Sequence, residues 1–353
     1  MFLRFLLLNC LLMLPVCHLQ AATAKADPEL AQKLVDGVYR PLHSRFADLS
    51  ASYARDFNDL CEKRASSSAY RLQADFTKVL EAFSAIELFR LGPLLEDNLK
   101  NRLFYWPDKR RVGERQLKKL LADENGATIS VDELAQKSVA LQGFSALERL
   151  LFTTNLHPLE VKPQCHLIPV VIQNIAEMAS KLDKAWLADS DYTRSMLQPH
   201  TDSEHFRTPD EVMRSVYTQA KVGLDIVLND KLAPLVSNEP KRMASAPMWL
   251  SQRPIANLTG NLQALRALLL DSGLLANTKF QEELGIEFDY IDHVLEKLKP
   301  TVYLQQDSGE LKRETRILLN QLTGVVAGVR YVVSVKVANA LGVRAGYNSE
   351  DGD

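Results

Sequence analysis

The sequence predicts an all-α protein made of two related helical bundles. Between Leu30 and Leu60, apolar residues recur at steps of three, four or seven, which is the spacing of one helix face. Helix signals divide the chain, among them a capping box at Ser130–Glu133 and a stop at Gly92-Pro93. Alternating β-branched runs are almost absent, and even the valine-rich stretch 325–337 keeps steps of three or four.

The N-terminal residues 1–24 have the parts of a secretory signal peptide. Arg4 supplies a positive charge, an apolar stretch Phe5–Val16 follows, and small residues lie in Ala21–Ala26. The apolar stretch is shorter than the roughly 20 residues that a membrane anchor needs. We therefore expect a periplasmic or envelope protein whose mature chain has no transmembrane span. Acylation of Cys17, as in lipoproteins, is the alternative to complete release.

The composition fits a globular protein with two domains. The chain has 353 residues and 46% apolar residues, enough for a sizeable core. It carries 42 basic and 44 acidic residues, for a net charge of −2. Proteins that bind nucleic acid usually have a basic excess, so this class of partner is excluded.

The mature chain would keep two cysteines, Cys61 and Cys165. In an oxidising compartment, two cysteines most simply form one disulfide, which here ties the two halves together. Two separate buried thiols are the alternative.

The helices can be placed in order along the chain. They are expected over residues 30–60, with a kink at Pro41, and over 72–90, 130–151, 168–186 and from Thr208 onward. The helical pattern breaks around 158–163, so the bundles are predicted over 25–160 and 161–353.

The two halves share an order of segments that suggests an internal duplication. The first half contains Leu91–Leu95, Trp106–Arg110 and Arg115–Leu121, and the second contains Leu232–Val236, Trp249–Arg253 and Asn261–Leu269. Such a duplicated pair often has its binding site where the halves meet.

Standard catalytic motifs are missing from the sequence. It has no His-Glu-x-x-His pair, no glycine-rich phosphate loop and no Gly-x-Ser-x-Gly elbow. The segment His200–His205 gathers two imidazoles and two carboxylates, but it lies in a polar loop of the kind that normally only faces solvent.

The segment Gly143–Phe152 is more informative. Ser145 and Glu148 are three residues apart and so share one helical face, beside an apolar stripe. Gly143, one turn earlier, allows a partner to approach closely. The alternative is a solvated Glu148 paired with a nearby basic residue.

This segment resembles the imelysin-like proteins. The resemblance extends over the mature chain through separated motifs in the same order: Gly92–Leu94, Phe104–Lys109, Gly143–Phe152 and Gly346–Asp353. It implies a duplicated pair of helical bundles in the envelope, a link to iron acquisition, and a family named for metallopeptidase activity. The family hallmark is Gly-x-His-x-x-Glu, and its positions here are Gly143, Ser145 and Glu148.

Ser145 stands where the family has its histidine. Serine does not replace an imidazole as a metal ligand, and a catalytic zinc usually has three protein ligands. We therefore predict no catalytic residue and no required cofactor, although the resemblance leaves iron or another divalent metal open. The candidate ligand-binding residues, through the resemblance, are Trp106, Asp108, Gly143, Ser145, Glu148, Arg253 and Asn261.

The sequence thus predicts a non-catalytic envelope binding protein associated with iron or metal uptake. Its ligand site would lie between the bundles, and its partner would be a metal, a metal complex, a peptide or an envelope protein. The alternatives are a metal-dependent peptidase that uses Glu148 and a scaffold that binds an outer-membrane or envelope protein.

Overall fold

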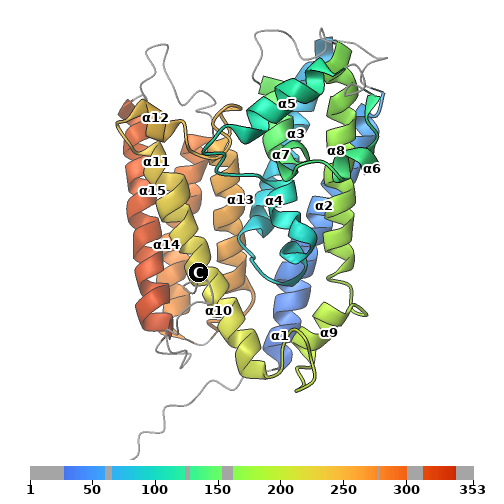
Figure 1. Ribbon diagram of the computed structural model, residues 1–353. Helices are drawn as coiled ribbons and strands as arrows, with labels where there is room; N and C mark the ends of the chain where they lie inside the picture. Colours follow the sequence, from blue (N-terminus) through green and yellow to red (C-terminus); the bar gives the residue numbers. More distant parts are fainter. Residues whose placement is uncertain are drawn as a thin grey trace, which may run out of the picture.

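A computed structural model describes residues 28–59, 66–123, 128–152, 162–276, 278–299 and 313–338. Within these residues every regular element is a helix, so the predicted all-α class is confirmed. Two groups of helices stand side by side in Figure 1, and the chain passes from one to the other after α9 (Asp191–Leu197). The predicted signal peptide, Cys17, Cys61 and the C-terminal segment 346–353 lie outside the described residues.

The first group begins with one long helix interrupted by a π-helical turn. Its parts are α1 (Pro28–Leu34), η1 (Val35–Tyr39) and α2 (Arg40–Phe57). Pro41 lies in the first turn of α2, directly after the π turn. Proline has no N–H to donate to the preceding turn. The wider π turn therefore lies where the sequence predicts a kink.

The remaining elements of the first group include two long helices, α3 and α8, and several short ones. They are α3 (Ser66–Glu87), η2 (Gly92–Leu94), η3 (Glu96–Asn98), α4 (Leu99–Leu103), α5 (Val112–Ala122), α6 (Val131–Ala135), η5 (Val139–Leu141), α7 (Phe144–Phe152) and α8 (Lys162–Lys184).

The second group contains three long helices and α13. Its elements are α10 (Pro209–Ile226), η6 (Val227–Leu232), α11 (Ala233–Leu235), α12 (Pro240–Met243), α13 (Pro254–Arg266), η7 (Ala267–Asp271), α14 (Lys279–Leu298), α15 (Arg313–Tyr331) and η8 (Val332–Val337). The valine-rich end of the chain is helical, as its spacing predicts.

Two of the predicted helix starts are capped as the sequence indicates. The Ser130 side chain accepts a hydrogen bond from the Glu133 N–H, and the Glu133 carboxylate accepts one from the Ser130 N–H at 2.8 Å. At α10, the Thr208 side chain accepts from the Glu211 N–H, and Pro209 opens the helix. Both caps satisfy N–H groups that the helix itself leaves unpaired.

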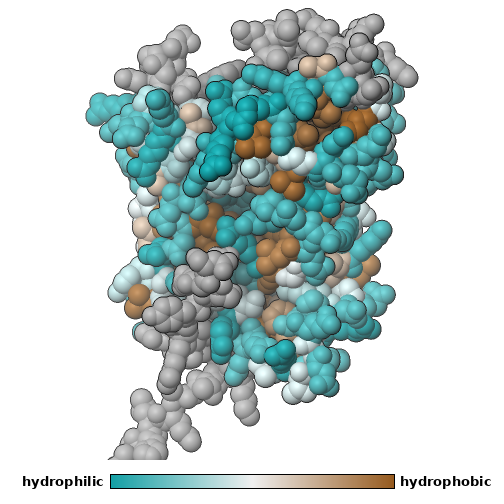
Figure 2. Space-filling model, in the orientation of Figure 1, coloured by the Kyte–Doolittle hydropathy of each residue, from teal (hydrophilic) through white to brown (hydrophobic). Residues whose placement is uncertain are grey.

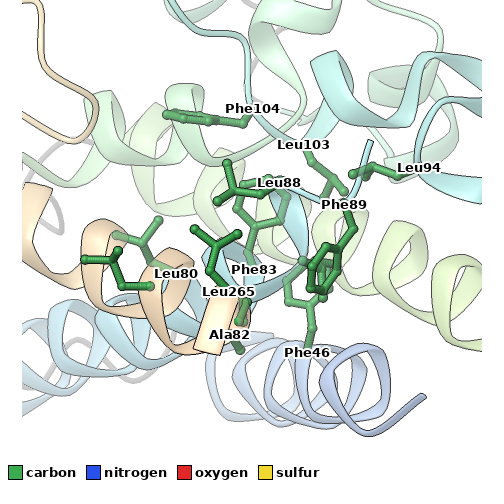
Figure 3. Packing of buried hydrophobic residues seen from close by; sticks show 14 of the residues in the cluster. Phe46, Leu80, Ala82, Phe83, Leu88, Phe89, Leu94, Leu103, Phe104 and Leu265 are labelled. Atoms are coloured by element: carbon green, nitrogen blue, oxygen red, sulfur yellow. The ribbon is translucent and has the colours of Figure 1, made fainter. Parts of the chain in front are cut away.

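Aromatic rings from three helices form the centre of the first group. Phe83 of α3 stacks on Phe144 of α7, with ring centroids 4.8 Å apart, and Phe46 of α2 lies against Phe83 at 5.6 Å. Figure 3 shows Leu265 of α13 near Phe83, together with Leu80 and Leu88, and all of them belong to one hydrophobic cluster. The hydrophobic core is therefore continuous from the first group into the second.

Gly260 allows α13 to approach α3 closely. A Cβ at residue 260 would lie 2.3 Å from the Glu81 carbonyl oxygen and 2.7 Å from the Ser84 Cβ. The two backbones therefore pack without a side chain between them, and this places α13 directly against the first group.

The division into two domains stays a prediction, but α8 packs with helices that precede the predicted boundary. The predicted boundary falls at residues 160–161, but α8 follows it in sequence and packs along α2, α6 and α7. The difference arises because an interrupted helical pattern marks a loop, whereas only non-local contacts decide which bundle the next helix joins.

The segments that suggest a duplication lie in different surroundings. Arg115–Leu121 belongs to α5, a short helix that packs against η5 and α7. Asn261–Leu269 belongs to α13 and η7, and α13 packs against α3. The duplication itself stays a prediction.

Within the described part of the chain, one helical segment, Arg313–Val337, is long and apolar enough by composition to cross a membrane. This differs from the expectation that the mature chain has no such segment. Leu319, Leu322 and Val326 of this helix are fully buried, and α15 packs against α14 and α10. The bundle therefore holds the helix by its apolar face.

Cys165 is fully buried at the start of α8. Because Cys61 lies outside the described residues, the Cys61–Cys165 disulfide stays a prediction.

His43 of α2 is buried beneath Trp186, with ring centroids 5.2 Å apart. Its Nδ1 donates to the Tyr39 carbonyl oxygen at 2.6 Å. Burial lowers the pKa of His43 to about 4, although Tyr39 and the Asp183 carboxylate favour its charged form. The folded protein therefore holds this imidazole neutral in conditions where the unfolded chain protonates it.

This difference predicts a loss of stability in acid. Below about pH 6.5, His43 is protonated in the unfolded state but stays neutral in the folded state until about pH 4. The free energy of unfolding therefore falls as the pH falls through this range. Between pH 7 and pH 4.5, His43 should account for roughly 2–3 kcal/mol of that decrease. Urea unfolding of wild type and His43→Gln at both pH values measures it. His200→Gln, at an exposed histidine, should keep the wild-type decrease, and an unchanged decrease in His43→Gln would contradict the assignment.

Candidate functional site

The hallmark segment begins at a backbone contact that only glycine permits. A Cβ at residue 143 would lie 2.1 Å from the Leu103 carbonyl oxygen and 2.3 Å from the Arg102 carbonyl oxygen. The Gly143 carbonyl itself accepts from the Ala146 and Leu147 N–H groups and so starts α7. Gly143 therefore sets α7 directly against the end of α4.

Ser145 and Glu148 leave α7 on one face, as predicted, and each binds a different loop. The Ser145 hydroxyl donates to the Tyr105 carbonyl oxygen at 3.0 Å, in the loop before α5. Glu148 Oε1 accepts from the Ser251 N–H at 2.9 Å and from the Ser251 hydroxyl at 2.8 Å. Ser251 belongs to the loop before α13, so Glu148 joins the first group to the second.

Burial of Glu148 raises the pKa of its carboxyl group. The two hydrogen bonds from Ser251 and the positive charges of Arg149 and Arg253 act in the opposite direction. The alternative of a solvated Glu148 is therefore wrong, since its side chain is enclosed and already holds two donors.

Arg253 lies at the junction of three elements. Its Nε donates to Thr77 Oγ1 of α3 at 2.7 Å, and it donates to the Ser251 carbonyl oxygen from Nη1. The guanidinium carbon lies 4.6 Å from the centre of the Phe152 ring, at the end of α7. A planar cation over an aromatic face is a favourable arrangement, and here it fixes the position of the loop that carries Ser251.

Asp108 caps α5 and pairs with α7. Its carboxylate accepts from the Val112 N–H at 2.6 Å and from the Gly113 N–H at 2.9 Å. Arg149 donates to the same carboxylate at 3.3 Å. These bonds satisfy N–H groups at the start of α5, where a negative charge is also favoured by the helix dipole.

Trp106 connects the loop before α5 with the loop before α13. Its indole Nε1 donates to the Ser245 carbonyl oxygen at 3.1 Å, and its ring stacks on Phe104 with centroids 6.0 Å apart. Trp106 and Asp108 therefore lie in a loop that meets the second-half loop 244–253, as expected if the two loops form one site.

Asn261 takes part in a separate arrangement, which we call the buried polar cluster: Ser84, Glu87, Lys231, Asn257 and Asn261. Lys231 Nζ forms an ion pair with Glu87 and donates to Asn257 Oδ1 at 2.8 Å and to Asn261 Oδ1 at 2.6 Å. Asn257 and Asn261 both donate to Glu87 Oε1, at 2.9 Å and 2.7 Å. Asn261 thus joins α3, η6 and α13 in the interior.

Lys231, Glu87 and Ser251 are not among the site residues that the sequence predicts. One signal was present for the buried polar cluster, because Asn257 and Asn261 lie one turn apart in a helix whose other residues are mostly apolar. Two amides on one buried face require polar partners. Nothing local marks Ser251, whose importance depends on Glu148, about a hundred residues earlier in the chain.

The described residues contain no group of three or more His, Cys, Asp or Glu side chains placed to hold a metal ion. His205 instead packs edge-on against Tyr192, with ring centroids 4.9 Å apart. Glu148 has a serine and two arginines around it, which is an environment that repels a cation.

The chain is similar to a known family and to solved structures. The family model described as imelysin matches residues 39–326. An imelysin-like protein from Psychrobacter arcticum 273-4 is 15% identical, with a TM-score of 0.67, over 92% of this chain and 98% of that chain. A protein described as an iron-regulated protein A precursor, from Parabacteroides distasonis ATCC 8503, is 13% identical, with a TM-score of 0.69, over 90% and 97%. No curated protein matches.

At these identities the two solved structures show that the fold is shared. The family match covers more than half of the chain and includes α7 and the loop 244–253. The chain therefore belongs to the imelysin family.

Proposed function

We propose that this chain is a non-catalytic binding protein of the bacterial envelope that serves the uptake of iron or another metal. The link to iron comes from the family resemblance and from the iron-regulated structural neighbour. The predicted signal peptide supports an envelope location. Its ligand would be recognised where the loop with Trp106 and Asp108 meets the loop with Ser251 and Arg253.

One observation carries the non-catalytic assignment: the Glu148 carboxylate is already engaged by the Ser251 N–H and hydroxyl. A catalytic metal would need Glu148 and two further ligands around an open position. Ser145 supplies no imidazole, and its hydroxyl is directed to the Tyr105 carbonyl. The hallmark positions thus hold loops together in this chain.

The charges near Glu148 favour an anionic ligand over a bare cation. Arg149 and Arg253 both act on Glu148, and the side chain of Arg149 is 18% exposed. Guanidinium groups bind carboxylates through paired hydrogen bonds. A metal complex with carboxylate groups fits this environment, and we use ferric citrate as its probe.

Calorimetric titration of the purified protein tests the proposal. Ferric citrate should release or absorb heat and raise the melting temperature, whereas zinc and copper ions should do neither. Loss of a charged hydrogen bond in Arg253→Gln should weaken ferric citrate binding about tenfold or more. Arg214→Gln, at an exposed arginine of α10, should bind like wild type.

Two results would contradict the proposal. Zinc-dependent cleavage of unfolded casein that disappears in Glu148→Gln would establish the metallopeptidase alternative. Absence of any heat or melting shift with ferric citrate and with ferrous, ferric, copper and zinc ions would remove the metal-related function and favour a scaffold for an envelope protein.

A further inference from the structure

A dense group of positive charges covers one end of the first helix group. Six basic residues occur between residues 109 and 119, and all six are exposed: Lys109, Arg110, Arg111, Arg115, Lys118 and Lys119. This density stands out in a chain whose net charge is −2.

The acidic residues of the same segment leave most of this charge uncompensated. The Asp108 side chain is only 9% exposed and is held by the N–H groups of α5 and by Arg149. Glu114 is shared between Arg111 and Lys118, at 2.6 Å and 2.8 Å. The Glu114 carboxylate thus forms ion pairs with two of the six basic residues.

The orientation of α5 presents these charges outward along one line. Gly113 and Leu117 are buried toward the bundle. Arg115, Lys118 and Lys119 lie three and four residues apart in α5 and share the opposite face, and Arg111 directly precedes the helix. The short helix therefore lies flat on the protein and carries a cationic stripe.

The charged surface continues onto the second helix group. Trp106 donates to the Ser245 carbonyl, and the Ser245 hydroxyl donates to the Arg242 carbonyl at 2.6 Å. Lys241 and Arg242 of α12 are both exposed. α5 and α12 lie at the same end of the molecule in Figure 1, and Figure 2 shows hydrophilic residues over both. We call these eight basic residues the basic face.

Apolar side chains adjoin the basic face. Leu250, in the loop that Trp106 contacts, is 41% exposed, and Trp106 itself is half-buried. Basic residues beside an exposed leucine and an indole are typical of surfaces that meet lipid headgroups, since the cations attract phosphates and the rings lie at headgroup depth.

We propose that the basic face binds the surface of a membrane rich in anionic phospholipid. A planar array of phosphates is complementary to a stripe of flexible cations spread over two helix groups. This inference does not rest on the proposed function, because it requires no metal and uses exposed cations, although the basic face borders the loops with Trp106 and Ser251.

Flotation with lipid vesicles tests this binding, with the chain from residue 25 onward, the predicted mature protein. It should float with vesicles of phosphatidylcholine mixed with phosphatidylglycerol and stay unbound with phosphatidylcholine alone. Binding should be lost at about 1 M salt, where the screening length is about 3 Å. The triple variant Lys109→Gln, Arg110→Gln and Lys119→Gln should partition about a hundredfold more weakly, because each of the three basic residues contributes roughly fivefold near the surface.

A matched control removes three exposed cations from elsewhere in the chain: Lys184→Gln, Arg207→Gln and Arg214→Gln. It has the same net charge as the triple variant and should bind like wild type. Equal binding to both vesicle types, or equal losses in the two triple variants, would overturn the proposal. Lack of binding to either vesicle would also overturn it and would direct the search to an acidic protein partner.

Discussion

Replacing Lys231 by methionine should lower the free energy of unfolding by about 3–5 kcal/mol. Lys231 is 2% exposed, and its ammonium group pairs with Glu87 and with the amide oxygens of Asn257 and Asn261. Methionine fills a similar volume but leaves the Glu87 carboxylate buried without a cation. A buried charge without its partner is among the most destabilising changes known for a folded protein.

A double variant separates the charge from the packing. Glu87→Gln with Lys231→Met removes both charges, and it should recover a large part of the stability that Lys231→Met loses. Neutral replacements for buried ion pairs are often tolerated, because the cost of removing two ions from water disappears with them.

Urea unfolding followed by circular dichroism measures these changes. Lys241→Met, at an exposed lysine of α12, should change the free energy of unfolding by no more than about 0.5 kcal/mol. If Lys231→Met unfolded at the same urea concentration as wild type, the buried polar cluster would not stabilise the contact between α3 and α13.

Gly143→Ala should be the second severe change, destabilising by about 1–3 kcal/mol or more. The added methyl would lie 2.1 Å from the Leu103 carbonyl oxygen, and both partners are backbone. No side-chain rotation relieves such a contact, so α7 must move away from α4. Because α7 carries Ser145 and Glu148, their bonds to Tyr105 and Ser251 should weaken together.

Gly324→Ala is the matched control, since a Cβ at residue 324 meets nothing within 4 Å. This glycine lies inside α15, where alanine favours the helix by about 0.5–1 kcal/mol. Thermal unfolding should therefore show opposite shifts for the two substitutions. A Gly143→Ala protein as stable as wild type would show that the α4–α7 contact tolerates a side chain.

Sequence spacing predicts most of the long helices and several of their ends, but the single helix expected over 130–151 is divided into α6, η5 and α7. The Thr208 cap and the Ser130 capping box follow from residues within a few positions of each other. The kink predicted at Pro41 is local in the same way, and the structure has a π turn directly before it. The shared face of Ser145 and Glu148 follows from helical spacing alone. Local chemistry is sufficient in these cases, because all partners lie within one or two turns of the same chain segment.

The role of each polar residue depends on contacts between distant parts of the sequence, which only the folded chain brings together. Glu148 accepts a hydrogen bond from Ser251. Arg253 donates to Thr77 and lies over the Phe152 ring. Asn261 binds Glu87 and Lys231, away from the predicted site. The same holds for α8, which joins the first group despite the break in pattern before it. These partners are far apart in sequence, and they meet because the helices pack together, with close backbone contacts at Gly143 and Gly260.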